Sequence, residues 1–108
     1  RQAKRAAQIL SDDLRQHIPV RQIAERFSVS ETSLKNYFRG VYGQNISTWL
    51  REIRMTEAAR LLSDTKRPIA EISEQVGYSN QGKFAAVFKK QFGFSPLEYR
   101  RSKNLENR

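Results

Sequence analysis

The chain has 108 residues, which is enough for one domain or for two very small ones. Its 20 Lys and Arg residues outnumber its 11 Asp and Glu residues, so the net charge is +9 at pH 7. A hydrophobic fraction of 38% predicts a modest core and excludes a disordered basic tail. The absence of Cys and a single His17 exclude disulfides, thiol catalysis and metal sites built on Cys or several His. This charge balance favours a negatively charged partner.

The composition also argues against an enzyme and against a membrane protein. The acids Asp12, Asp13 and Asp64 are not spaced for a metal pair, and the chain offers no nucleophile and base set. No apolar run approaches the ~20 residues of a membrane span. We therefore expect no catalytic activity, no cofactor and no membrane partner. The chain begins at Arg1 without an initiator Met or a signal-peptide pattern, so we expect a fragment of a longer chain.

The expected fold is all-α, because no segment alternates with the period of a strand. A first helix is predicted over residues 2 to about 17, with an apolar face of Ala3, Ala6, Ala7, Leu10 and Leu14. Pro19 opens a second helix, whose apolar positions are Val20, Ile23, Ala24 and Phe27. Ser30 caps a third helix, which ends at Gly43 and buries Leu34, Tyr37, Phe38 and Val41.

A long fourth helix follows, capped by Asn45, with the apolar residues Ile46, Trp49, Leu50, Ile53, Ala58, Leu61 and Leu62. Residues 64–67 are a polar connector, and Pro68 opens a further helix. Residues 95–98, Ser95-Pro96-Leu97-Glu98, form a capping box at the start of the last helix. The periodic apolar positions are assigned to the core rather than to base stacking, and they include Leu34, Phe38, Trp49, Phe84, Phe88 and Tyr99.

The second half of the chain repeats the first half. Residues 19–23 align with 68–72, and further along Leu34, Phe38 and Trp49 align with Phe84, Phe88 and Tyr99. Each copy is a short helix, a turn and a second helix with a polar far side, which is the helix-turn-helix pattern. The turns are residues 28–30 and 77–79, and Gly77 can supply the positive φ that such a turn often needs. Two units in register, joined by a long helix, are a stronger signal than one unit alone.

From about Ile18 to Arg101 the sequence resembles the AraC/XylS family of transcriptional regulators. The most specific motifs are Pro68-Ile69-Ala70-Glu71-Ile72, Val76-Gly77-Tyr78-Ser79, Phe84, Phe88-Lys89-Lys90 and Phe92-Gly93-Phe94-Ser95-Pro96-Leu97-Glu98-Tyr99-Arg100. The linker run also matches, through Leu50-Arg51-Glu52-Ile53-Arg54-Met55, Ala58 and Leu61-Leu62.

The resemblance implies a DNA-binding domain of about seven helices, in which a linker helix bridges two helix-turn-helix subdomains. The expected boundaries are 1–44 for the first subdomain, 45–63 for the linker helix, 64–101 for the second subdomain and 102–108 for a polar C-terminal tail. In this family the domain usually follows an N-terminal domain that binds an effector or dimerises. The resemblance also implies a bacterial, cytoplasmic, nucleoid-associated protein, and activation through contact with RNA polymerase.

In each unit the second helix is expected to enter the major groove of double-stranded DNA. Position and resemblance favour Thr32, Ser33, Lys35 and Asn36 as base contacts in the first unit, with Ser33 near the groove wall. An Asn can bridge adenine N6 and N7, a Lys can donate to guanine O6 and N7, and a Thr methyl can contact thymine. An alternative to base contact is that Thr32 and Ser33 are present only because their residue types are favoured in the first turn of a helix. Glu31 is interpreted as stabilising the helix dipole rather than as recognising cytosine.

The second unit departs from the family at its outward face. The family commonly carries a larger polar side chain, often Arg, at the position of Ala86, and Gly82 has no side chain to read with. With Gly82 and Ala86 set aside, the candidate base contacts of the second unit are Gln81 and Lys83. We therefore expect residues 30–42 to be the main base reader and the second unit to position the domain on phosphates.

Basic side chains beside the grooves are expected to contact phosphates, namely Arg21, Arg39, Lys66, Arg67, Lys89, Lys90, Arg100 and Arg101. The last four can equally be ordinary solvated charges. Neutralising about six phosphates predicts a log–log salt slope of roughly −5. A linker helix of about 17 residues spans ~25 Å. The two recognition helices are then expected about one DNA turn (~34 Å) apart, in successive major grooves.

Two alternative functions stay open at this point. Non-specific, nucleoid-type DNA binding predicts no loss of affinity when the duplex sequence is scrambled. A helix-turn-helix module that binds another protein does not need a net charge of +9 on 108 residues.

Overall fold

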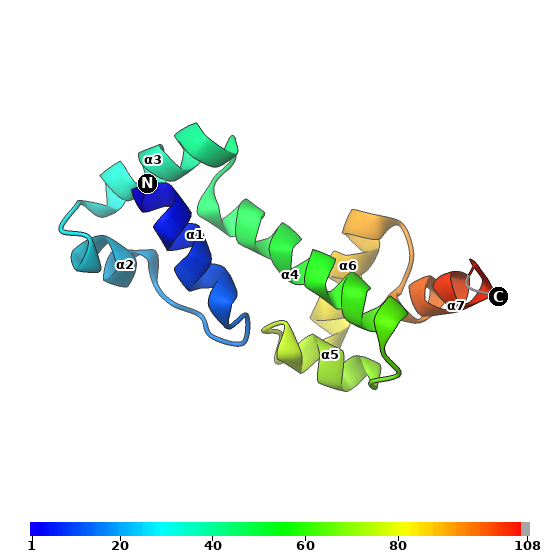
Figure 1. Ribbon diagram of the computed structural model, residues 1–108. Coiled ribbons are helices and arrows are strands. Elements are labelled where there is room, and N and C mark those ends of the chain that lie inside the picture. The colour runs from blue at the N-terminus through cyan, green and yellow to red at the C-terminus, as the bar shows by residue number, and fades with distance from the viewer. Residues whose placement is uncertain (107–108) are drawn as a thin grey trace. The chain divides into compact units, whose positions relative to one another are not determined.

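The computed structural model describes residues 1–106 of the chain (Figure 1). Within these residues the regular structure is entirely helical, so the prediction of an all-α fold is confirmed. The helices are α1 (Gln2–Asp12), α2 (Val20–Arg26), α3 (Glu31–Tyr42), α4 (Ile46–Asp64), α5 (Ile69–Gln75), α6 (Gln81–Phe92) and α7 (Pro96–Glu106). No helix in this part of the chain is both long enough and apolar enough to cross a bilayer.

The chain divides into two compact units, the first over residues 1–51 and the second from Glu52 onward. Each unit contains one helix-turn-helix, formed by α2 and α3 in the first and by α5 and α6 in the second. Helix α4 begins in the first unit and ends in the second, so it contributes to both cores.

In the first unit, α1 and α2 both pack against α3. Helix α1 contributes mainly alanines to this core, which lets its backbone approach α3 closely. Leu34 and Phe38 of α3 are completely buried as a result. The buried residues of the unit are Ala3, Ala6, Ala7, Leu10, Ile23, Ala24, Leu34, Phe38 and Ile46.

In the second unit, the C-terminal part of α4 supplies the apolar face that α1 supplies in the first. Helix α5 packs against α6, and α6 packs against α7. Phe84 and Phe88 are completely buried, like their counterparts Leu34 and Phe38, so the repeat in the sequence is also a repeat of the core. The buried residues here are Met55, Ala58, Ala59, Leu61, Leu62, Ile72, Val76, Phe84 and Phe88.

A group of three aromatic rings, an aromatic triad, joins the second helix of each helix-turn-helix to the helix that follows it. In the first unit the ring of Phe38 lies 4.5 Å from Tyr42 and 5.2 Å from Trp49 of α4, between ring centroids. The second unit repeats the triad with centroid distances of 4.7 to 5.6 Å among Phe88, Phe92 and Tyr99. Each triad fixes the orientation of α3 or α6 in its own unit.

The predicted caps of the third and fourth helices are confirmed. Ser30 Oγ accepts a hydrogen bond from the Ser33 N–H at 3.0 Å. Asn45 Oδ1 accepts one from the Thr48 N–H at 2.8 Å. Gly43 ends α3 with a left-handed φ of 74°, which lets the chain reverse sharply into α4.

The predicted capping box at the start of α7 is also confirmed. The Ser95 N–H donates to Glu98 Oε1 at 2.9 Å, and the Glu98 N–H donates to Ser95 Oγ at 3.1 Å. The Ser95 N–H stabilises the ionised carboxylate and so lowers the pKa of Glu98 below its usual value.

Two expectations for the first unit are wrong. The first helix ends at Asp12 rather than near residue 17, because the Asp13 carboxylate accepts from the Arg15 N–H at 3.1 Å and competes with helical hydrogen bonding. Tyr37 and Val41 are not core residues, since they are 49% and 50% exposed. The buried stripe of α3 is narrower than its periodicity suggested and continues to Tyr42 instead.

Arg100 of α7 holds the C-terminal end of α4. Its Nε donates to the Leu62 carbonyl at 3.0 Å, and one terminal nitrogen donates to the Thr65 carbonyl at 3.4 Å. Carbonyls at a helix end have no intrahelical partner, and a cation beside them also complements the helix dipole. Arg100 therefore has a structural role within the second unit.

We expect Leu34→Ala to lower the free energy of unfolding by ~2–5 kcal/mol, because it leaves a cavity in the core of the first unit. Urea unfolding monitored by circular dichroism measures the change. Tyr37→Ala is the control on the same helix, and its loss should be much smaller since Tyr37 is half exposed. Equal losses for both variants would contradict the orientation of α3.

We expect Arg100→Ala to destabilise the protein by about 1–3 kcal/mol, because two carbonyls at the end of α4 lose a charged donor. The neighbouring exposed Arg101→Ala should change stability by less than about 0.5 kcal/mol. Thermal unfolding of both variants tests this contrast, and an unchanged midpoint for Arg100→Ala would refute the structural role.

Candidate nucleic-acid interface

The exposed face of α3 carries the polar residues that the sequence singled out for DNA. Thr32, Lys35, Asn36 and Arg39 are exposed, and Ser33 is half-buried. This face points outward because Leu34 and Phe38, which lie between these positions in the sequence, are buried on the opposite side. The structure therefore brings the four side chains together along one surface of the first unit.

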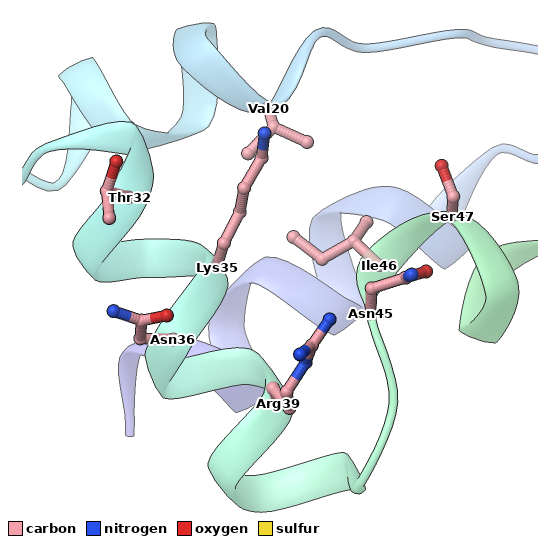
Figure 2. A pocket seen from close by; sticks show the side chains of 8 residues that line it. All are labelled: Val20, Thr32, Lys35, Asn36, Arg39, Asn45, Ile46 and Ser47. Carbon is pink, nitrogen blue, oxygen red and sulfur yellow. The ribbon is translucent and has the colours of Figure 1, made fainter.

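A cleft of about 500 Å³ runs beside this face (Figure 2). Its walls come from the start of α2, from α3 and from the start of α4. The lining residues are Val20, Thr32, Lys35, Asn36, Arg39, Asn45, Ile46 and Ser47. Polar groups, two cations and the apolar side chains of Val20 and Ile46 thus line one surface of the first unit.

The side chains on this face point in two directions. In Figure 2, Lys35 extends toward Val20 at the start of α2, and Arg39 extends toward Asn45 and Ile46 at the start of α4. Thr32 and Asn36 project from the same face of α3 and line the same cleft. The cleft is therefore lined by two neutral polar side chains and by two cations from one face of α3.

Two local contacts restrain residues of the first turns of α3. Lys35 Nζ lies 3.0 Å from Glu31 Oε2, so the cation is paired one helical turn back. The Ser30 hydroxyl donates to Ser33 Oγ at 2.9 Å in addition to capping the helix. Ser33 is thus part of the helix start, while Thr32 and Asn36 keep their exposed side chains directed outward.

The corresponding face of α6 carries fewer polar side chains than the face of α3. Gln81 and Lys83 are exposed, but Gly82 and Ala86 leave the centre of the face without a polar group. A Cβ added at Gly82 would lie 3.3 Å from Asn80 Oδ1, the atom that caps α6 through the Lys83 N–H. A larger side chain at this position therefore crowds the cap.

The candidate phosphate contacts are distributed over several elements. Lys66 and Arg67 lie in the exposed connector before α5, and Lys89 and Lys90 are exposed in the last turn of α6. Arg67 Nη1 donates to Gln75 Oε1 at 2.6 Å, which holds the guanidinium near the end of α5. Arg21 of α2 lies 3.8 Å from Glu25 and is highly exposed. Arg101 is exposed, whereas the guanidinium of Arg100 is engaged with α4, and phosphate contact by Arg100 stays a prediction.

Sequence reasoning missed four residues that line the cleft, Val20, Asn45, Ile46 and Ser47. Val20 and Asn45 were assigned only to helix packing and capping, and Ser47 carried no pattern. Val20 reaches the cleft from the start of α2, whereas the residues at the start of α4 reach it because the chain reverses at Gly43. A local reading of the sequence converts neither into neighbours of α3. Away from the cleft, the sequence did not indicate that Arg54 of α4 is buried. This burial lowers the pKa of its guanidinium below the usual value.

Comparison with known proteins assigns the chain to a family. A family model described as a helix-turn-helix domain matches residues 23–102. The arabinose operon regulatory protein of Salmonella typhimurium is 36% identical over 96 residues, which are 88% of this chain and 34% of that protein. The regulatory protein SoxS of Escherichia coli is 32% identical over 91 residues, which are 84% of this chain and 85% of SoxS.

Solved structures share the same fold. The C-terminal domain of AraT, a response regulator from Geobacillus stearothermophilus, is 37% identical with a TM-score of 0.86, over 94% of this chain and 84% of that chain. The DNA-binding domain of AdpA, solved in complex with a target DNA, has a TM-score of 0.88 over 96% of this chain and 94% of that chain. At 23% identity it shows the fold alone.

The relatives named above are regulatory proteins rather than enzymes. The chain spans about a third of the length of the arabinose operon regulatory proteins that it matches. The family match over residues 23–102, together with the similarity to SoxS over most of both chains, shows that this chain belongs to the AraC/XylS family of transcriptional regulators, as a helix-turn-helix DNA-binding domain.

Proposed function

We propose that the chain binds double-stranded DNA sequence-specifically to regulate transcription, with α3 as its main base reader. The observation that carries this proposal is the exposed polar face of α3 beside a cleft that holds Lys35 and Arg39. A helix with such a face can enter the major groove while its flanking cations contact the phosphates on either side.

Thr32 and Asn36 are the base contacts that the geometry supports best. They lie one helical turn apart on the face of α3 that lines the cleft, and both are exposed. The Asn36 amide can bridge adenine N6 and N7, and the Thr32 methyl can contact a thymine methyl. Lys35 is proposed as a further base contact, and Ser33, which is bound to the cap, as a residue at the groove wall.

Helix α6 is proposed to contact DNA with less sequence discrimination. Gln81 can hydrogen-bond a base edge, and Lys83 can donate to a guanine or to a phosphate. The small residues Gly82 and Ala86 allow close approach but offer no hydrogen-bonding group. The second unit then acts mainly as a phosphate clamp, through the exposed cations Lys66, Arg67, Lys89, Lys90 and Arg101.

The two recognition helices are proposed to occupy successive major grooves of one asymmetric site. Helix α4 has 19 residues and is therefore about 28 Å long. A spacing near one DNA turn, about 34 Å, is compatible with two readers on one chain. With Arg21 and Arg39 added, the candidate cations can neutralise about six phosphates, so we expect a log–log salt slope of roughly −5.

The intact protein is proposed to be a bacterial, cytoplasmic transcriptional activator. Two relatives are named as transcription activators, the lactose operon activator of Staphylococcus xylosus and RhaR of Yersinia pseudotuberculosis. RNA polymerase and an effector bound by an N-terminal domain are the partners that this proposal includes. Non-specific, nucleoid-type binding is the competing function, and the smooth face of α6 favours it for the second unit.

A binding selection from random duplexes at near-physiological salt tests the proposal with the chain as it is. Enrichment of one or two short sequence blocks supports specific reading, and two blocks should lie about one helical turn (~34 Å) apart. Retained binding without enrichment would favour the non-specific function. No binding to any duplex would refute DNA binding by this chain.

We expect Asn36→Ala to weaken binding to the selected site by ~1–3 kcal/mol and to relax specificity at one base pair, because a bidentate base contact is lost. Fluorescence anisotropy with selected and scrambled duplexes measures both effects. An equal loss on the two duplexes would show that Asn36 does not read a base.

We expect Arg67→Ala to weaken binding to all sequences and to reduce the salt slope by about 1, because a phosphate contact is lost. Gln75→Ala is the matched control, since it removes the partner of Arg67 without removing the charge. An unchanged slope in Arg67→Ala would assign its guanidinium to the contact with Gln75 alone.

A further inference from the structure

We propose that Glu31 and Lys35 read one base pair together, with Glu31 as a specificity-determining residue. The inference rests on the proposed entry of α3 into the major groove. The sequence alone assigned Glu31 to helix stabilisation, but the structure places its carboxylate against the ammonium of a candidate base contact. A donor and an acceptor are therefore held side by side on the reading helix.

The position of this pair suits contact with base edges. Glu31 and Lys35 occupy the first two turns of α3, and each directly precedes one of the outward residues Thr32 and Asn36. Their side chains are 43% and 55% exposed, so both charged groups are accessible to a partner. In helix-turn-helix proteins the N-terminal residues of the recognition helix are the ones that contact bases.

The charge of Glu31 also needs an explanation on this surface. A carboxylate that approaches DNA is repelled by the phosphates unless it accepts a hydrogen bond inside the groove. The scaffold does not require the acid, because α6 forms a helix of equal length with Gln81 and Ala85 at the corresponding positions. The donors that the major groove offers are the amino groups of cytosine and adenine.

The spacing of the pair matches a base pair. Lys35 Nζ and Glu31 Oε2 are 3.0 Å apart. In a G·C pair, guanine O6 accepts from cytosine N4 across a Watson–Crick hydrogen bond of about 2.9 Å. The ammonium can therefore donate to guanine O6 and N7 while the carboxylate accepts from cytosine N4 on the other strand.

The same geometry ranks the four base pairs. A T·A pair presents the same acceptor–donor order, with O4 and N6, but places the thymine methyl where guanine has N7. C·G and A·T pairs reverse the order, so the carboxylate meets a carbonyl oxygen and the ammonium meets an amino group. We expect the pair to favour G·C, to accept T·A less well and to reject the two reversed pairs.

The test compares the chain with its E31Q variant on the selected duplex. Each position of the selected sequence block carries the four base pairs in turn, so that the base pair contacted by Glu31 and Lys35 is among those compared. A Gln amide can turn to donate or to accept, so discrimination against the reversed base pairs should fall by about fivefold or more. Lys35→Met should instead lose the preference for G·C over T·A, because no donor is left for guanine N7.

Glu25→Gln is the matched control, since Glu25 pairs with Arg21 in the same i,i+4 arrangement on α2, at 3.8 Å. It removes the same charge and should leave discrimination unchanged. Equal changes in affinity on all four duplexes, for Glu31→Gln and for Lys35→Met, would overturn the reading pair. A chain that selects no sequence would instead refute the proposed function on which the inference rests.

Discussion

The contact between the second helix of each helix-turn-helix and the helix after it determines what each unit presents to DNA. Phe38 lies edge-on to Trp49 at 5.2 Å with an interplanar angle of 75°, and Phe88 lies edge-on to Tyr99 at 5.3 Å and 81°. Edge-to-face rings add attraction beyond their buried area and favour one mutual orientation. Because Phe38 is also completely buried, a rotation of α3 about its axis would lose both the edge-to-face contact and the burial of this ring. The outward direction of its polar residues follows from this constraint.

The two units conserve this core arrangement while their outer faces differ. Buried positions correspond in kind, as Phe38 does to Phe88, but the outward position of Asn36 is taken by Ala86 in α6. Exposed positions contribute little to stability, so a face can change without loss of the fold. Helix α6 is therefore as well held as α3 while carrying fewer groups that distinguish bases. Two equally stable units, of which only the first carries many polar side chains on its exposed face, suit the proposed division in which the first unit contacts bases and the second contacts phosphates.

Local sequence signals predicted the features that depend on neighbouring residues. The caps at Ser30 and Asn45 and the capping box at Ser95 form as expected, because each needs only a residue three positions away. The features that the sequence did not predict depend on how helices pack on one another or on residues far apart in the chain. Tyr37 lies at helical spacing but outside the width that α1 and α2 cover, and Arg100 is drawn to carbonyls 38 and 35 residues earlier. The sequence predicted a phosphate contact for Arg100, which stays a prediction, but it did not indicate the carbonyls of Leu62 and Thr65 as partners.

The candidate site could be predicted only in part, since its residues on α3 share a face but its flanking residues come from other helices. Gly43 reverses the chain with a φ of 74°, and Asn45 starts α4 at once, so Ser47 returns to the side of Arg39. In the cleft that results, the cations extend toward the starts of two neighbouring helices, and the neutral side chains of Thr32 and Asn36 line the cleft from the same face of α3. A single face of α3 therefore offers both cations and neutral polar groups to a partner. Extending α3 by one residue would move the point where the chain leaves it by about 100° around the axis of α3, so the start of α4 would no longer line the cleft beside Arg39.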